Sequence, residues 1–81
     1  MTVALTLPTG EGEALRLEGE RLEIISPTAF APGQPLSFTA GALHLEARSQ
    51  GSKKRDDGRF DVRLRLINFS RVKRERLEEL L

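Results

Sequence analysis

The sequence predicts a mainly β fold, a small antiparallel β-barrel of about six strands with one C-terminal α-helix. Several short segments alternate apolar and polar residues and are separated by turn residues, as strands of a meander or barrel do. The last segment instead has helical spacing and contains neither Gly nor Pro. Because 81 residues provide one modest hydrophobic core, residues 1–81 are expected to form a single domain.

Alternation with a period of two predicts three strands in the first third of the chain. Apolar side chains on such strands point to one face and polar side chains to the other. Pro8-Thr9-Gly10 and Gly19-Glu20 are expected to make the turns between them, since Gly accepts positive φ without steric cost. The residues expected to face the core are Val3, Leu5, Leu7, Leu15, Leu17, Leu22 and Ile24.

The stretch "FAPGQPLSF", from Phe30 to Phe38, combines a turn with the start of a strand. Pro32-Gly33 predicts a type II-like turn, because Pro fixes φ at the first central position and Gly takes the positive φ that follows. Leu36 and Phe38 are expected to face the core. Phe30 is expected to cap one end of it.

Two further strands flank a polar segment. "ALHLEAR" (42–48) and "RFDVRLRLI" (59–67) alternate regularly, whereas residues 49–58 have no apolar side chain and are expected to form a loop. An Asp-Gly turn at Asp57-Gly58 is expected at the tip of a hairpin. The inward residues of the two strands are expected to be Leu43, Leu45, Ala47, Phe60, Val62, Leu64 and Leu66.

The final segment predicts an amphipathic helix over about residues 70–81. Ser70 is a suitable N-cap, and strong helix formers follow it. A helix of about twelve residues is marginal alone, so it is expected to pack on the sheet. The face expected to do so carries Val72, Arg76, Leu77, Leu80 and Leu81, with Phe69 just before the helix.

The composition argues against several classes of function. The chain has no Cys, and its 13 Lys and Arg residues against 12 Asp and Glu residues give a net charge of +1. No Cys means no disulfide or thiolate site and fits a reducing cytoplasm, and the N-terminal segment reads as neither a signal peptide nor a membrane span. His44 has no metal-ligand or nucleophile motif around it. We therefore expect a cytoplasmic protein without membrane partner, catalytic residues, metal or cofactor, and not an enzyme.

Arginines provide the remaining chemistry. Those that alternate with Phe60 and Val62 should point outward, and Arg binds phosphate with bidentate geometry. A solvated face balanced by neighbouring acids is the alternative, and no exposed aromatic side chain is expected that would stack on a base. The candidate ligand or nucleic-acid surface consists of Arg16, Arg21, Arg55, Arg59, Arg63 and Arg65.

From about residue 22 to residue 81, the order of features resembles a PilZ domain, the small β-barrel of bacterial cyclic di-GMP signalling. The corresponding segments here are "FAPGQPLSF", "ALHLEAR", "GRFDVRLRLINFS" and "RERLEELL". The family binds its nucleotide with an Arg-x-x-x-Arg arm before the first strand and with Asp-x-Ser-x-x-Gly on an early strand. At the second motif this chain reads "RLEGER", so that Arg16, Glu18 and Arg21 replace Asp, Ser and Gly, and no Arg precedes Arg16.

The resemblance, without these motifs, implies a degenerate PilZ-like regulatory module that acts through protein–protein interaction and does not bind cyclic di-GMP in the usual way. The helix is the first expected partner surface, through Arg74, Glu75 and Glu78. An edge strand left open by the meander is the second, for a partner or for another copy in a homo-oligomer. The alternative function is a basic-striped barrel that binds nucleic acid or a nucleotide through the outward arginines.

Overall fold

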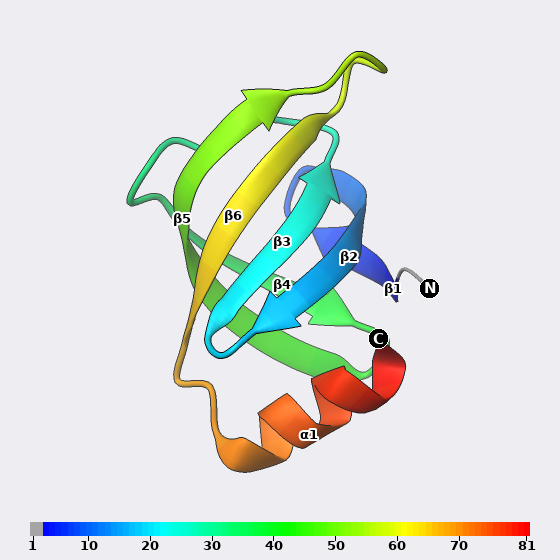
Figure 1. The fold of residues 1–81 in the computed structure, drawn as a ribbon, viewed down its shortest axis with the longest axis vertical. Coiled ribbons are helices and arrows are strands. Elements are labelled where there is room, and N and C mark those ends of the chain that lie inside the picture. Colours follow the sequence, from blue (N-terminus) through cyan, green and yellow to red (C-terminus); the bar gives the residue numbers. More distant parts are fainter. Residues whose placement is uncertain (1–2) are drawn as a thin grey trace.

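Alternating side chains form six strands that close into an antiparallel barrel, followed by one helix (Figure 1). The computed structural model describes residues 3–81. Its elements are β1 (Val3–Leu7), β2 (Gly10–Glu18), β3 (Arg21–Ser26), β4 (Pro35–Ala40), β5 (Leu43–Lys54), β6 (Phe60–Ile67) and α1 (Arg71–Leu80). The predicted fold class is confirmed.

The strands follow the order β1-β2-β3-β6-β5-β4 around the barrel, and β1 pairs with β4 to close it. Within residues 3–81, this closure has one ladder pair, Thr6 opposite Thr39. The expectation of an open edge strand is therefore wrong. Two three-stranded meanders, β1-β2-β3 and β4-β5-β6, pair with each other through β3 with β6 and through β1 with β4. The helix and the β5–β6 hairpin lie at opposite ends of the long axis (Figure 1).

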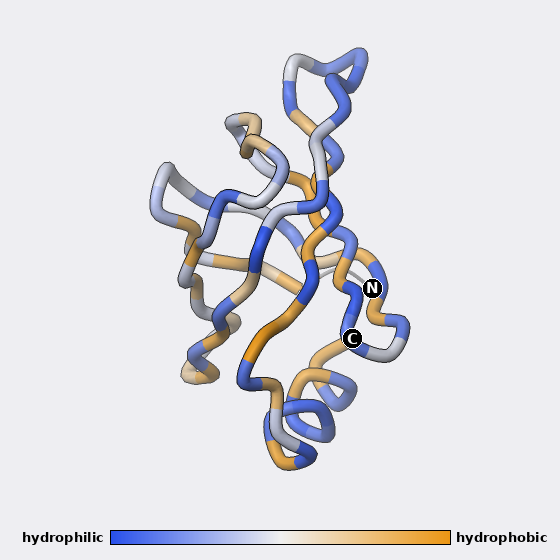
Figure 2. The backbone as a smooth tube through the Cα atoms, turned by 90° about the vertical axis from the view of Figure 1, so that its left-hand side faces the viewer, coloured by the Kyte–Doolittle hydropathy of each residue, from blue (hydrophilic) through white to orange (hydrophobic). Residues whose placement is uncertain are grey.

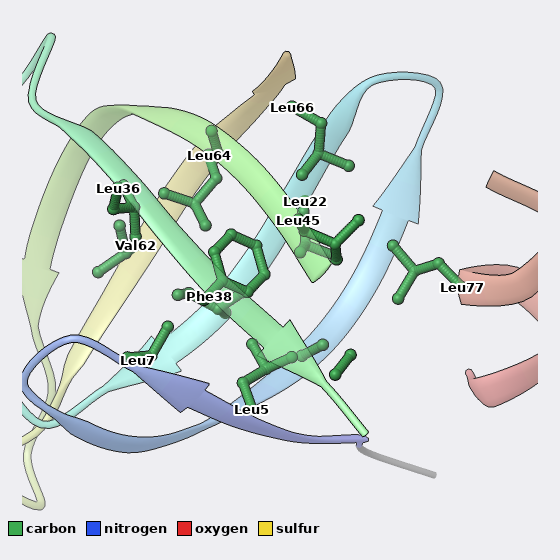
Figure 3. Close-up of a cluster of buried hydrophobic side chains, with 14 of the residues drawn as sticks. Leu5, Leu7, Leu22, Leu36, Phe38, Leu45, Val62, Leu64, Leu66 and Leu77 are labelled. Atoms are coloured by element: carbon green, nitrogen blue, oxygen red, sulfur yellow. The ribbon is translucent and has the colours of Figure 1, made fainter. Parts of the chain in front are cut away.

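The inward side chains fill the barrel as one hydrophobic cluster (Figure 3). Phe38 lies in the middle of it and is 2% exposed. Gly12 is buried in the wall, where a Cβ would stand 2.4 Å from the backbone oxygen of Ile25, so the close approach of β2 and β3 requires Gly. The cluster contains Leu5, Leu7, Ala14, Leu22, Ile24, Phe30, Leu36, Phe38, Ala40, Leu45, Ala47, Val62, Leu64, Leu66 and Leu77.

Among the strand residues predicted to face the core, Leu15 neither belongs to this cluster nor packs against it, whereas Val3, Leu17, Leu43 and Phe60 are partly buried against it. Ala14 pairs with Ile24 while Arg16 pairs with Glu23, so Leu15 is the extra residue of a β-bulge. A one-residue insertion exchanges the two faces of a strand. Ala14 therefore points inward in place of Leu15, and Leu17 still packs against the core.

The polar segment 49–58 was expected to form a loop, but most of it is strand. β5 continues to Lys54, opposite Phe60 of β6, and only residues 55–59 form the connection. Polar side chains suit the outer part of this hairpin, because it projects beyond the barrel (Figure 2) and its residues 52–54 and 56–58 are exposed. Gly58 takes a φ of 85°, as the Asp-Gly turn requires.

The Phe30 to Phe38 stretch forms the predicted turn. Gln34 N donates to Ala31 O at 3.0 Å, and Gly33 takes a φ of 84°. Phe30 is 3% exposed and caps the core as expected. Its carbonyl oxygen accepts hydrogen bonds from Ser49 Oγ at 3.1 Å and Ser52 Oγ at 2.8 Å, so β5 holds the turn in place.

The helix α1 is anchored to the barrel by few side chains. Ser70 is its N-cap, with Oγ accepting from Lys73 N at 3.3 Å, as predicted. Leu77 is the one buried residue of the helix and points toward the core (Figure 3). Val72 is 60% and Leu80 42% exposed, so their predicted packing on the barrel is wrong. No helix in the part of the chain that the structure describes could span a membrane.

Candidate functional site

The six predicted arginines divide into two groups in space. The β2–β3 hairpin and β6 lie side by side, and they bring four of the arginines to one outer surface (Figure 1). Arg55 and Arg59 instead lie at the tip of the β5–β6 hairpin, which projects beyond the barrel. The arginine face, as we call the first group, consists of Arg16, Arg21, Arg63 and Arg65, together with Arg48 described next.

Arg48 of β5 is a member of this surface that the sequence analysis missed. In the strand register Arg65 stands directly opposite Arg21 on one side and directly opposite Arg48 on the other. These three residues form the arginine row, which crosses β3, β6 and β5. The alternation in "ALHLEAR" is a signal that could have identified Arg48 as outward, but only the strand order shows which residue it faces.

Acidic neighbours neutralise part of the arginine face. Arg16 contacts Glu23 at 3.1 Å and Glu18 at 3.7 Å. Arg65 has a single long contact, 3.9 Å from Nε to Oε2 of Glu20. Among residues 3–81, no carboxylate lies within 4.0 Å of the other three side chains, Arg21, Arg48 and Arg63.

Two shallow depressions adjoin the arginine row. Gln50, at the second β-bulge between Ser49 and Gly51, contributes to both. No aromatic side chain lines either one, so neither offers a platform for stacking a base. The first, of about 120 Å³, is lined by Arg16, Glu18, Arg21, Leu22, Glu23, Gln50 and Arg63. The second, of about 330 Å³, is lined by Glu18, Glu20, Arg21, Gln50 and Arg65.

The arginines at the hairpin tip are paired with carboxylates instead. Arg55 Nη1 donates to Asp61 Oδ1 at 2.6 Å, and this hydrogen bond raises the pKa of Arg55. Asp57 accepts from the backbone N–H of Arg59 at 2.9 Å and from its guanidinium at 3.2 Å. The backbone hydrogen bond from Arg59 is the main cause that lowers the pKa of Asp57. These ion pairs join residues within the hairpin tip, so the guanidinium groups of Arg55 and Arg59 have few donors left for a ligand.

The predicted partner residues on α1 have different surroundings. The guanidinium of Arg74 lies 5.6 Å from the ring centre of Phe69 and is half-buried, whereas Glu78 is exposed. Glu75 Oε1 accepts from Arg71 Nε at 3.3 Å, one helical turn earlier. The exposed apolar side chains of the helix, Val72 and Leu80, were missed as surface residues because their spacing also fits a buried face.

Other chemistry has little support in the described residues. His44 is exposed on β5. Residues 3–81 contain no group of three or more His, Asp or Glu side chains arranged to hold a metal ion.

Comparison of the chain with protein-family models, with curated proteins and with solved structures gave no match.

Proposed function

We propose that this domain is a non-enzymatic interaction module, a degenerate PilZ-like barrel that binds a protein partner through the solvent face of α1. The observation that carries the proposal is the exposure of Val72 (60%) and Leu80 (42%). These are the large apolar side chains that the described residues leave in solvent. They lie two helical turns apart with Arg76 between them, which is the i, i+4, i+8 spacing of helices that dock into a groove.

The charge order of α1 supports a role other than stability. Its first turn has no acidic residue and its last turn no basic one. Arg71 and Lys73 face the positive end of the helix dipole, and Glu78 and Glu79 face the negative end, so both pairs are unfavourably placed. A partner groove that is acidic near the start of α1 and basic near its end would complement this order.

The experiment compares capture of a protein by the whole chain with capture by a variant that carries Val72→Glu and Leu80→Glu. Both residues are exposed, so the variant should fold, and the melting curve checks this. Ser37→Glu with Ala42→Glu is the matched control, because it adds the same two charges at exposed positions of β4 and of the turn that follows it. The expected result is a protein whose measured affinity is equal for the wild type and the control and at least about tenfold lower for the double variant, since burying a new charge opposes binding.

Two results would contradict the proposal. One is that no protein binds saturably. The other is that the double variant and the control bind equally well, which would place the contact elsewhere on the barrel.

A degenerate PilZ-like role also implies that cyclic di-GMP does not bind in the usual way. Arg16, Glu18 and Arg21 stand where the family's second motif has Asp, Ser and Gly. The carboxylate of Glu18 lies 3.7 Å from Arg16, so it is not free to accept a hydrogen bond from the edge of a guanine. Calorimetric titration of the whole chain at low salt should give no saturable heat. Saturable binding would overturn the degenerate assignment while leaving the α1 experiment to be judged on its own result.

A further inference from the structure

The arginine row is an arrangement that does not stabilise the barrel. Adjacent strands are about 4.8 Å apart, so three guanidinium-bearing positions follow one another within about 10 Å. Like charges directly opposite each other on antiparallel strands are destabilising. Among the described residues, the carboxylate that compensates the row is Glu20, and its contact with Arg65 at 3.9 Å is long for an ion pair.

The residues around the row resemble a site for anionic oxygen atoms. Arg21 and Arg48 have exposed side chains with no carboxylate within 4.0 Å among the described residues, and Arg48 Nη1 donates to Gly33 O at 3.2 Å, which holds its position. Gln50 lies in both adjoining depressions, where its amide N–H groups can also donate. Guanidinium groups match phosphate oxygens in a bidentate geometry.

We propose that the arginine row, with Arg63 and Gln50, binds a chain that carries phosphate groups in a line. The row offers closely spaced positive charges in a line, and such a chain supplies closely spaced negative charges in a line. Since no aromatic side chain lines the depressions, recognition stops at the phosphates and does not read a base. Two chains carry phosphates in a line: inorganic polyphosphate, in which the phosphates are linked directly, and the backbone of a single-stranded nucleic acid, in which sugars separate them.

The nearby acids set limits on this site. Glu23 pairs with Arg16, and Glu20 approaches Arg65. Among residues 3–81, the guanidinium groups of this surface with no carboxylate within 4.0 Å are those of Arg21, Arg48 and Arg63. Binding is therefore expected to be modest and to weaken steeply with salt, by a slope that counts the few phosphates neutralised.

The test titrates the whole chain with long-chain inorganic polyphosphate and, separately, with single-stranded oligothymidylate, at low and at moderate salt. The variant with Arg21→Gln and Arg48→Gln removes two charges from the row. The matched control, Arg71→Gln with Arg76→Gln, removes two charges from exposed positions of α1 and therefore has the same net charge as the row variant. The row variant should bind at least about tenfold more weakly than the control, because each lost contact is a charge-assisted hydrogen bond.

The two titrations separate the sources. If the wild type binds one of the two probes and the row variant binds it more weakly, the site is supported and that probe identifies its ligand. If the wild type binds both probes and the row variant binds both more weakly, the site accepts either ligand. Equal weakening in the row variant and the control would overturn the proposal, because it would show a response to net charge only. Absence of binding by the wild type to both probes at low salt would overturn it too.

If the double row variant is unfolded by its melting curve, Arg21→Gln alone replaces it. The side chain of Arg21 is exposed and makes no ion pair among the described residues, and Gln keeps the backbone pairing of β3, so the substitution should leave the barrel intact. It should still bind the probe several-fold more weakly than Arg71→Gln does, and equal binding would overturn the site.

Discussion

The interior of the barrel and its charged exterior follow different rules. Inside, strand alternation, the bulge at Leu15, the turn at Gly33 and the packing around Phe38 all favour the same structure. Outside, the arginine row places like charges opposite one another, and α1 carries its charges against its own dipole. One part of the exterior, the hairpin tip, does pair its charges.

This contrast helps to locate function. A sequence that specifies one fold is consistent across levels, and local conflicts are expected where function imposes them. The interior needs no explanation beyond stability. The arginine row and α1 do, and they are the two surfaces proposed to bind.

The largest effect is expected inside the barrel. Phe38→Ala would remove the central side chain of the core, which is 2% exposed, and should lower the free energy of unfolding by about 3–5 kcal/mol. Urea unfolding measures this. Phe38→Leu, which keeps most of the volume, should cost much less; similar losses for both would mean that the core is loosely packed around this position.

A smaller and more local effect is expected at the anchor of α1. Leu77→Ala should cost about 2–3 kcal/mol, near the lower end for a buried Leu because the helix end can relax. Since Leu77 is the single buried residue of α1, the helix should open before the barrel does. Amide hydrogen exchange would then be faster in α1 than in β3 or β6. Equal acceleration in all three would show that α1 and the barrel form one cooperative unit.

On the exterior, one substitution in α1 should increase stability. Lys73→Glu would place a carboxylate three residues after the Ser70 cap, completing a capping box and complementing the helix dipole. The expected gain is about 0.5–1 kcal/mol in urea unfolding. Lys73→Gln, which can make the capping hydrogen bond without the charge, should gain less. A loss of stability would mean that Lys73 has a structural partner, and the conflict with the dipole would no longer indicate function.

A pair of substitutions compares the arginine row with the hairpin tip. Arg65→Gln relieves the repulsion from Arg21 and Arg48, so stability should stay the same or rise by a few tenths of a kcal/mol. Arg55→Gln breaks the 2.6 Å contact with Asp61, so its melting temperature should fall. If both variants were destabilised alike, the arginine row would contribute to the stability of the barrel, and its arginines would not be available for a ligand.

The sequence predicted most of the barrel because period-two alternation is a local signal. It failed at Leu15 and in residues 49–54, where bulges and pairing with β6 decide the structure and no local pattern encodes them. The same limit applies to the candidate site. Outward arginines could be identified one by one, but Arg48 joined Arg21 and Arg65 only through the strand order.

The smallest expected effect concerns acid and the hairpin tip. The pKa of Asp57 is lowered, chiefly by the hydrogen bond from the backbone N–H of Arg59, so its carboxylate stabilises the folded state. That stabilisation is fully present above the ordinary value of 3.8 and is lost as the pH falls from there through the lower pKa of the folded protein. Melting temperatures measured across this range should fall less for Asp57→Asn than for the wild type.

Asp56→Asn is the matched control, because it removes the adjacent exposed carboxylate and leaves the Asp57 hydrogen bonds to Arg59 in place. It should keep the acid response of the wild type. An unchanged acid response in Asp57→Asn would mean that the tip charges contribute no more to stability than those of the arginine row, and the distinction between the two groups of arginines would then rest on ligand binding alone.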